Sequence, residues 1–216
     1  MTDLFADIRD DQPACEELAE GAVLLRNFFA AEQPDVIAAL RTIVKAAPFR
    51  HLVTPGGHTM SVAMTNCGRV GWVSDSSGYR YDPVDPDSGK PWPEMPAPFR
   101  DLAARAAVQA GFDAFMPDAC LINRYKPGAK LSLHQDKDEL DLRAPIVSVS
   151  LGLPATFLFG GLTRSAPQKR YRLTHGDVVV WGGPARLAYH GVAPLPDGEH
   201  PVMGGQRINL TFRKTQ

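Results

Sequence analysis

Cysteine is scarce in this chain of 216 residues, which contains three cysteines, Cys15, Cys67 and Cys120. The number is odd, and no two of them have the CxxC spacing of a redox motif or a zinc knuckle. A fold held together by disulfides or by structural zinc is therefore not expected. Reduced thiols are typical of the cytoplasm, which is where we expect the protein to act.

Long apolar runs and a strong net charge are missing as well. No hydrophobic run approaches the roughly 18–20 residues of a membrane span, and residues 1–5 lack the basic, apolar and small-residue zones of a signal peptide. We therefore expect no membrane association. The net charge of −1 and the pI near 6.6 exclude a basic field over the whole protein, and with it tight sequence-independent binding to duplex DNA.

What is present is the composition of an ordinary globular protein, with 44% hydrophobic and 22% charged residues. The length suits one domain with a sizeable core, which we expect to act as a monomer. Residues 1–20 are polar and are expected to be peripheral, and residues 22–29 are predicted to form a strand. Apolar residues at helical spacing predict an amphipathic helix over residues 34–47, and a second helix is predicted over residues 98–110, before Gly111.

Residues 54–98 differ from the rest because glycine and proline are concentrated there. Short strand-like pieces at residues 59–65 and 79–81 are embedded in this segment. It is too polar and too aromatic for a plain linker, and loops of this kind often carry function. We therefore interpret residues 54–98 as a functional, loop-rich element.

From residue 118 onward the pattern changes to short strands at even spacing, separated by turns. The predicted strands cover residues 119–125, 131–134, 146–151, 156–159, 170–173, 177–181, 188–192 and 207–213. This pattern favours a sandwich or barrel, and a double-sheet jelly roll is the natural choice. The predicted fold class is mainly β (α+β), with residues 1–115 as an N-terminal region and residues 116–216 as the core of one domain.

The tripeptide His134-Gln135-Asp136 is the first candidate site. In a strand, residues i and i+2 share one face and lie about 6.5–7 Å apart, so His134 and Asp136 can reach one metal ion. His190, on another predicted strand, can complete the set. Two imidazoles and one carboxylate are the ligands that hold Fe(II) on one face and leave the opposite face open for chemistry.

A second copy of the motif shows how little the tripeptide proves by itself. Chance gives about half a His-x-Asp in a chain of this composition, and this chain also contains His175-Gly176-Asp177. A central glycine and the apolar run that follows are typical of a turn that enters a buried strand. We interpret this second copy as a turn.

Residues 207–213 carry the second candidate site. Apolar residues alternate there with Arg207, Asn209, Thr211 and Arg213, so one face is apolar and the other is strongly hydrogen-bonding. If the polar face is exposed, this is an ordinary amphipathic strand; if it faces the interior, two buried cations require an anionic ligand. A dicarboxylate meets that need, because arginine binds carboxylates in a bidentate manner. The two arginines are about 20 Å apart along a straight strand, so their side chains must converge to share one small ligand.

Taken together, these motifs resemble the AlkB family of DNA-repair dioxygenases. The resemblance rests on residues 123–125, 131–138, 189–191 and 207–213, and it extends to residues 60–68 and 72–81. It covers nearly the whole chain from Asp3 to Arg213. The match is weaker at residues 6–20, 163–172 and 196–206, and Ala188 stands where well-known members carry an aromatic residue.

The resemblance implies a double-stranded β-helix (jelly roll) that binds Fe(II) through His134, Asp136 and His190. It also implies that 2-oxoglutarate and O2 are co-substrates. The implied contacts of 2-oxoglutarate are Asn123, Arg124, Tyr125, Arg207, Asn209, Thr211 and Arg213.

The resemblance also gives residues 54–98 a role, as a nucleotide-recognition lid over the iron. By this correspondence Trp72 stacks on the flipped base and Asp138 faces the edge of the base. The implied contacts with the rest of the nucleic acid are Tyr79, Arg80, Tyr81 and Arg164. N1-methyladenine and N3-methylcytosine are cationic near neutral pH, so an aromatic ring and a carboxylate are complementary to them.

The implied reaction is the oxidative demethylation of these bases in alkylated single- or double-stranded DNA, with RNA as a further substrate. Its products are the repaired base, formaldehyde, succinate and CO2. Bases that have lost their pairing are cheaper to extrude from a duplex, and single strands are cheaper still.

Two alternatives stay open. One is a dioxygenase that acts on RNA, protein or a small molecule. The other is a zinc hydrolase or a metal-free binding module that uses the same pocket. A run of basic residues between Lys126 and Arg172 fits either a local groove for nucleic acid or a solvated face.

Overall fold

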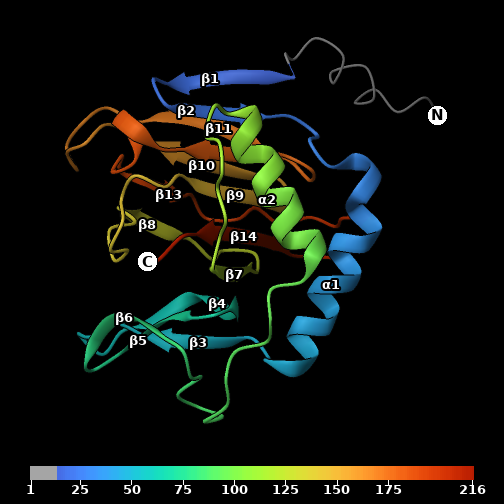
Figure 1. The fold of residues 1–216 in the computed structure, drawn as a ribbon, viewed down its shortest axis with the longest axis vertical. Helices are drawn as coiled ribbons and strands as arrows, with labels where there is room; N and C mark the ends of the chain where they lie inside the picture. Colours follow the sequence, from blue (N-terminus) through green and yellow to red (C-terminus); the bar gives the residue numbers. More distant parts are fainter. Residues whose placement is uncertain (1–13) are drawn as a thin grey trace.

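The computed structural model describes residues 14–216, and antiparallel sheets dominate it (Figure 1). The larger sheet has the strand order β1 (Cys15–Ala19), β2 (Ala22–Leu25), β12 (Val178–Trp181), β9 (Ile146–Gly152), β14 (Arg207–Arg213), β7 (Ala119–Tyr125), β4 (Thr59–Gly68) and β3 (Arg50–Val53). The smaller sheet has the order β11 (Lys169–Leu173), β10 (Ala155–Phe159), β13 (His190–Val192) and β8 (Leu131–His134). A separate hairpin consists of β5 (Gly71–Asp75) and β6 (Gly78–Asp82).

Two helices, α1 (Gln33–Ala46) and α2 (Ala97–Gln109), cover one face of the larger sheet (Figure 1). Both predicted helices are thus confirmed, each displaced by one residue. Two short 3-10 turns, η2 (Ala30–Glu32) and η3 (Gly183–Ala185), complete the helical structure of the described chain. Across residues 14–216 no helix has the length and apolarity that crossing a membrane requires.

The larger sheet is buried on both faces, and its two faces belong to two different cores. Apolar side chains from α1, α2 and the sheet form one core, which includes Ile208 and Leu210 of β14. A second core lies between the two sheets and includes Phe157 of β10 and Trp181 of β12. Because successive strand residues point to opposite faces, β14 delivers its apolar residues to the helices and its polar residues to the space between the sheets.

The sequence analysis missed β1, β3 and β5. These strands are four or five residues long and are partly exposed, so none has the sustained apolar alternation that identifies a strand. β1 belongs to the stretch of residues 1–20 that we expected to be peripheral. The rest of that prediction, like the analysis of residues 1–5, lies outside the described residues.

Strands from both predicted regions of the chain interleave in the larger sheet. β4 pairs with β7 over the residue pairs Ala63–Arg124 to Gly68–Ala119, so the segment before residue 115 is hydrogen-bonded to the segment after it. The hairpin β5–β6 lies beside β3 and β4, near one edge of the larger sheet (Figure 1). The loop-rich element of residues 54–98 therefore contains a structured hairpin.

The tripeptide His175-Gly176-Asp177 forms a turn, as predicted. Gly176 has a φ of +94°, which favours glycine. The Asp177 carboxylate accepts hydrogen bonds from the Thr174 backbone N–H at 2.8 Å and from Arg26 Nη1 at 3.0 Å. This carboxylate therefore ties the turn to the loop after β2.

Replacement of this buried carboxylate tests the interpretation as a turn. Asp177→Ala leaves the backbone N–H groups of Thr174 and Asn27 without their acceptor and removes one of the two carboxylates paired with Arg26. We expect it to lower the free energy of unfolding by about 3 kcal/mol. Fe(II) binding should be unchanged. Chemical denaturation and anaerobic Fe(II) titration measure the two quantities. Loss of Fe(II) binding in a folded Asp177→Ala variant would contradict the interpretation.

Candidate active site

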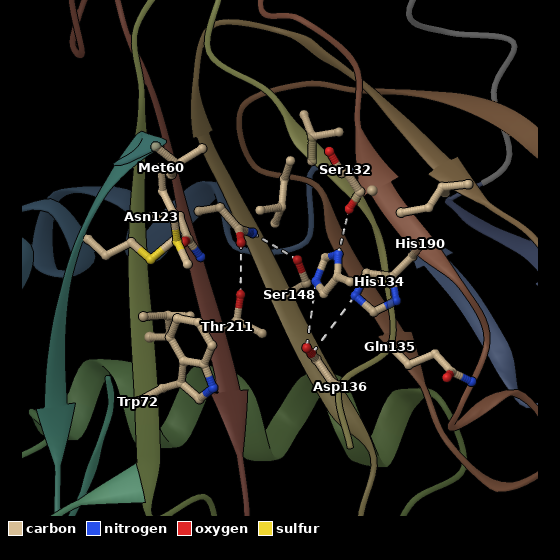
Figure 2. A pocket seen from close by; sticks show the side chains of 18 of the residues that line it. Met60, Trp72, Asn123, Ser132, His134, Gln135, Asp136, Ser148, His190 and Thr211 are labelled. Atoms are coloured by element: carbon tan, nitrogen blue, oxygen red, sulfur yellow. Dashed lines mark hydrogen bonds and ion pairs between the residues drawn. The ribbon is translucent and has the colours of Figure 1, made fainter. Parts of the chain in front are cut away.

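Three side chains of the predicted triad meet at the open edge of the smaller sheet. His134 and His190 are direct cross-strand partners on β8 and β13, and their ring centroids are 4.3 Å apart. Asp136 follows β8, and the three residues offer ligand atoms that all lie within 4.8 Å of one another. Figure 2 shows the three side chains pointing toward one another. In the part of the chain that the structure describes, this is the one cluster of its kind.

Backbone carbonyls orient both imidazoles. His134 Nδ1 donates to the Ser132 carbonyl and His190 Nδ1 to the Ala188 carbonyl, each at 2.9 Å. Because a carbonyl only accepts, Nδ1 carries the proton and Nε2 is free to bind a metal. Ala188 contributes its backbone here, so the missing aromatic side chain does not affect this bond.

The protonation states also suit a metal site. Burial lowers the pKa of His190 to about 4, so its imidazole is neutral at pH 7, as a ligand must be. Burial alone would raise the pKa of Asp136, but Arg213 and the two histidines outweigh it and hold that pKa well below its usual range. Asp136 is therefore a carboxylate, and the set has the chemistry that Fe(II) requires.

Gly191 lets the two histidine strands approach each other. A Cβ at this position would lie 2.7 Å from the Leu131 carbonyl oxygen of the neighbouring strand, closer than real Cβ atoms come. The pairing of β13 with β8 is also irregular between His190 and Val192. Glycine beside His190 therefore permits the close contact that brings the imidazoles together.

A cavity of about 670 Å³ extends from this cluster between the sheets and under the hairpin β5–β6. Most of the side chains expected to bind iron, 2-oxoglutarate or nucleotide line it, namely Trp72, Tyr79, Tyr81, Asn123, Tyr125, His134, Asp136, Asp138, Arg164, His190, Arg207, Asn209, Thr211 and Arg213. In Figure 2 Trp72 lies across the cavity from His134 and His190. The structure thus brings together residues from distant parts of the chain around one space.

The polar face of β14 is directed inward, which answers the question that the sequence left open. Arg207 is 2% exposed, and its guanidinium lies 5.1 Å from the centroid of the Tyr125 ring. Its Nη2 donates to Ser150 Oγ at 3.1 Å. Within residues 14–216, Arg207 Nε and Nη1 and the nearby Asn123 Oδ1 have no hydrogen-bond partner. A buried cation with unused donors fits the carboxylate of 2-oxoglutarate.

Arg213 at the other end of β14 is already paired. Its Nη2 lies 2.8 Å from Asp136 Oδ2, and its Nε lies 3.3 Å from Glu139 Oε1. Between the arginines, Thr211 Oγ1 donates to Asn209 Oδ1, and Asn209 Nδ2 donates to Ser148 Oγ, each at 2.8 Å. The two guanidinium groups therefore differ in their pairing: Arg213 has two carboxylate partners and leaves only Nη1 without a hydrogen bond, whereas Arg207 has no carboxylate partner within residues 14–216.

Two of the expected site residues do not line the cavity. Arg124 lies on the opposite face of β7 from Asn123, with its guanidinium 4.6 Å from the centroid of the Phe49 ring. Arg80 forms ion pairs with Asp75 and Asp82 within the hairpin. Strand alternation explains Arg124, because neighbours along β7 point to opposite faces.

The sequence analysis missed several residues of the site. Glu139 and Arg186 form a buried ion pair at 2.9 Å beside Asp136, and Trp181 lies 4.8 Å from His190 between ring centroids. The acidic pair that begins at Asp138 was a possible signal for Glu139. Arg186 carried no signal, because its partners are distant in the sequence.

Comparison with known proteins defines the class first. The family model described as the 2OG-Fe(II) oxygenase superfamily matches residues 21–213, so the chain is an Fe(II)- and 2-oxoglutarate-dependent dioxygenase. It is 60% identical over 214 residues to the alpha-ketoglutarate-dependent dioxygenase AlkB of Escherichia coli (strain K12), which covers 99% of this chain and 98% of that protein. The chain belongs to the AlkB family, which repairs alkylated nucleic acid by oxidative demethylation.

Two further relatives extend the comparison. The solved structure of OsALKBH1 matches with a TM-score of 0.79 and 29% identity, and the match covers 93% of this chain and 99% of that one. The nucleic acid dioxygenase ALKBH1 of Mus musculus is 34% identical over 134 residues, 61% of this chain and 34% of that protein. The jelly-roll prediction is confirmed, and the alternatives of a zinc hydrolase and a metal-free binding module are removed.

When bound, Fe(II) and 2-oxoglutarate supply an O2-derived oxidant that hydroxylates a C–H bond. The chain's own residues prepare the place for this chemistry. His134 and His190 present unprotonated Nε2 atoms, and Arg207 offers a carboxylate its unused N–H groups. His190 and Arg207 are each at most 5% exposed.

The contrast between Arg207 and Arg124 gives a matched test. Arg207→Met removes the open cation, and we expect the Kd of 2-oxoglutarate to rise about 10- to 100-fold, since a charge-assisted hydrogen bond contributes about 1.5–3 kcal/mol. Arg124→Met, on the outer face of β7, should change this Kd less than about twofold. Anaerobic titration followed by the iron–2-oxoglutarate charge-transfer band measures both. An equal rise in the Kd of 2-oxoglutarate in both variants would mean that Arg124 also contributes to binding this ligand.

Proposed function

We propose that this enzyme demethylates N1-methyladenine and N3-methylcytosine in alkylated DNA, with a preference for single strands and flipped bases. The observation that carries the proposal is the pair Trp72 and Asp138, joined by a 2.8 Å hydrogen bond from the indole Nε1. Both residues line the cavity that contains the His–Asp–His cluster. An aromatic face and a carboxylate complement a cationic methylated base through stacking, cation–π and Coulomb attraction.

The proposal gives each set of residues a role. Fe(II) is held by His134, Asp136 and His190. The ligand 2-oxoglutarate is held by Arg207, with Asn123, Tyr125, Asn209, Thr211 and Arg213 around it. Residues 54–98 form the lid, and the nucleotide is contacted by Trp72, Tyr79, Tyr81, Asp138 and Arg164.

The charge around the cavity supports a nucleic acid substrate. Lys130, Lys137 and Arg164 line the cavity and can approach phosphates, although the whole chain has a net charge of −1. A local positive groove with an aromatic platform is the usual means of binding single strands. We further propose that the enzyme acts as a monomer in the cytoplasm, where the free thiols of Cys15, Cys67 and Cys120 remain reduced.

The central experiment compares methylated oligonucleotides of one sequence. Single-stranded DNA, duplex DNA and single-stranded RNA, each with one N1-methyladenine, are incubated with the iron-loaded enzyme, 2-oxoglutarate and O2. Formaldehyde and succinate should appear in about equal amounts, fastest with single-stranded DNA, because no pairing has to be broken. An unmethylated strand is the control. Faster turnover of RNA would reverse the proposed ranking, and succinate without formaldehyde from any strand would refute the substrate.

Trp72 provides a test of base recognition. Trp72→Ala removes a stacking surface worth about 1–3 kcal/mol per base, so the KM for the methylated strand should rise about tenfold or more. Succinate formation without nucleic acid should be unchanged, because Trp72 lies across the cavity from the histidines. Trp72→Phe, which keeps an aromatic face, should recover most of the affinity. Equal loss of both activities in Trp72→Ala would assign this residue to the structure of the site instead.

A further inference from the structure

The hairpin β5–β6 contacts the loop after β8 through two consecutive carboxylates. Trp72 and Tyr81 are direct cross-strand partners in the hairpin, so their side chains project from the same face. Trp72 Nε1 donates to Asp138 Oδ2 at 2.8 Å, and the Tyr81 hydroxyl donates to Glu139 Oε1 at 2.5 Å. Both carboxylates lie within three residues of the metal ligand Asp136 in the sequence.

These two contacts differ in their burial. The Trp72–Asp138 bond is exposed, so an incoming base or water can replace it at little cost. The Glu139 side chain is 1% exposed, and its second oxygen, Oε2, accepts a 2.9 Å bond from Arg186 Nη2. With both oxygens occupied, Glu139 is not free to recognise a base, and its carboxylate must serve the protein itself.

Glu139 shares one cation with Asp136. Arg213 Nη2 and Nε both donate to Asp136 Oδ2, at 2.8 and 3.2 Å, and Nε also lies 3.3 Å from Glu139 Oε1. Arg186 fixes the same loop, because its Nη1 donates to the Asp136 carbonyl at 2.6 Å. A continuous series of contacts therefore runs from Tyr81 on the hairpin through Glu139 and Arg213 to the carboxylate of Asp136.

We propose that Glu139 is a positioning residue that couples the hairpin to the metal ligand Asp136. Arg213 divides its charge between two carboxylates, so the contact it makes with one depends on the strength of its contact with the other. When Tyr81 moves with the hairpin, Glu139 gains or loses a hydrogen bond, and its hold on Arg213 changes. The inference rests on the proposed function, because the hairpin is displaced when a bound base replaces Trp72 as the hydrogen-bond partner of Asp138.

The coupling has a predictable sign. A cation beside Asp136 Oδ2 competes with a metal for the electrons of that carboxylate. Removal of the Glu139 charge leaves Arg213 entirely to Asp136 and so weakens metal binding. Removal of the Tyr81 hydroxyl frees Glu139 Oε1 to hold Arg213 more tightly, which relieves Asp136 and strengthens metal binding.

The first test measures metal affinity, without nucleic acid or turnover. In anaerobic Fe(II) titrations, Glu139→Gln should raise the Kd about tenfold, and Tyr81→Phe should lower it about two- to threefold. Opposite shifts are the signature of a shared cation. A loss of affinity in both variants, or no change in Tyr81→Phe, would overturn the proposal. If Glu139→Gln does not fold because Arg186 loses its carboxylate partner, the direction of the change in the Fe(II) Kd of Tyr81→Phe alone tests the proposal.

The second test measures how well oxidation is coupled to the substrate. In Tyr81→Phe, which keeps the aromatic ring and removes only the hydroxyl, the ratio of formaldehyde to succinate should fall about threefold. The matched control is Asp75→Asn, which breaks the exposed 2.9 Å ion pair between Asp75 and Arg80 on the same hairpin. The control should keep the wild-type ratio.

The two tests separate the possible results. An unchanged ratio of formaldehyde to succinate in Tyr81→Phe, with or without a raised KM, would leave Tyr81 as a nucleotide contact alone and would refute the coupling. If the wild-type enzyme releases no formaldehyde from methylated strands, the proposed substrate is refuted. The coupling through Glu139 is still tested, because the Fe(II) titrations use no nucleic acid.

Discussion

Burial of positive charge between the two sheets is the constraint on which the site depends. Arg207 and Arg213 both point from β14 into this space, and each is at most 5% exposed. An unpaired buried cation costs several kcal/mol, so the surroundings must supply negative charge. Asp136 and Glu139 do so for Arg213. Arg207 contacts the Ser150 hydroxyl and the Tyr125 ring and forms no ion pair with a carboxylate among residues 14–216. This cation therefore fits an anionic ligand.

The polar face of β14 and the set of metal ligands were predictable from the sequence. The alternation in β14 indicated one hydrogen-bonding face, and the His-x-Asp motif with His190 indicated a metal set. The sequence alone did not decide whether the face of β14 pointed inward, because an amphipathic strand has the same pattern in either case. The structure decides it, since Ile208 and Leu210 belong to the core under the helices and the polar residues must take the other face.

Strand β1, the role of Arg186 and the position of Arg124 could not be predicted, each for a different physical reason. Strand β1 lies at the edge of its sheet and is mostly exposed, so burial leaves no pattern in its sequence. The role of Arg186 depends on contacts with Asp136 and Glu139, which precede it by 50 and 47 residues. Family resemblance also over-assigned Arg124. Its place beside Asn123 and Tyr125 in the sequence puts it on the opposite face of β7, against Phe49.

The two carboxylates after the metal ligand show how one short loop can serve both recognition and catalysis. Asp138 makes its contact with Trp72 in the open part of the cavity, where exchange with a base carries little desolvation cost. Glu139 is enclosed by Tyr81, Arg186 and Arg213, where loss of a partner leaves a buried charge uncompensated. A base can therefore replace the first contact at little cost, whereas any change in the second alters the hold of Glu139 on Arg213. In the coupling that we propose, Tyr81, Glu139 and Arg213 connect occupancy of the base site to the iron ligand Asp136.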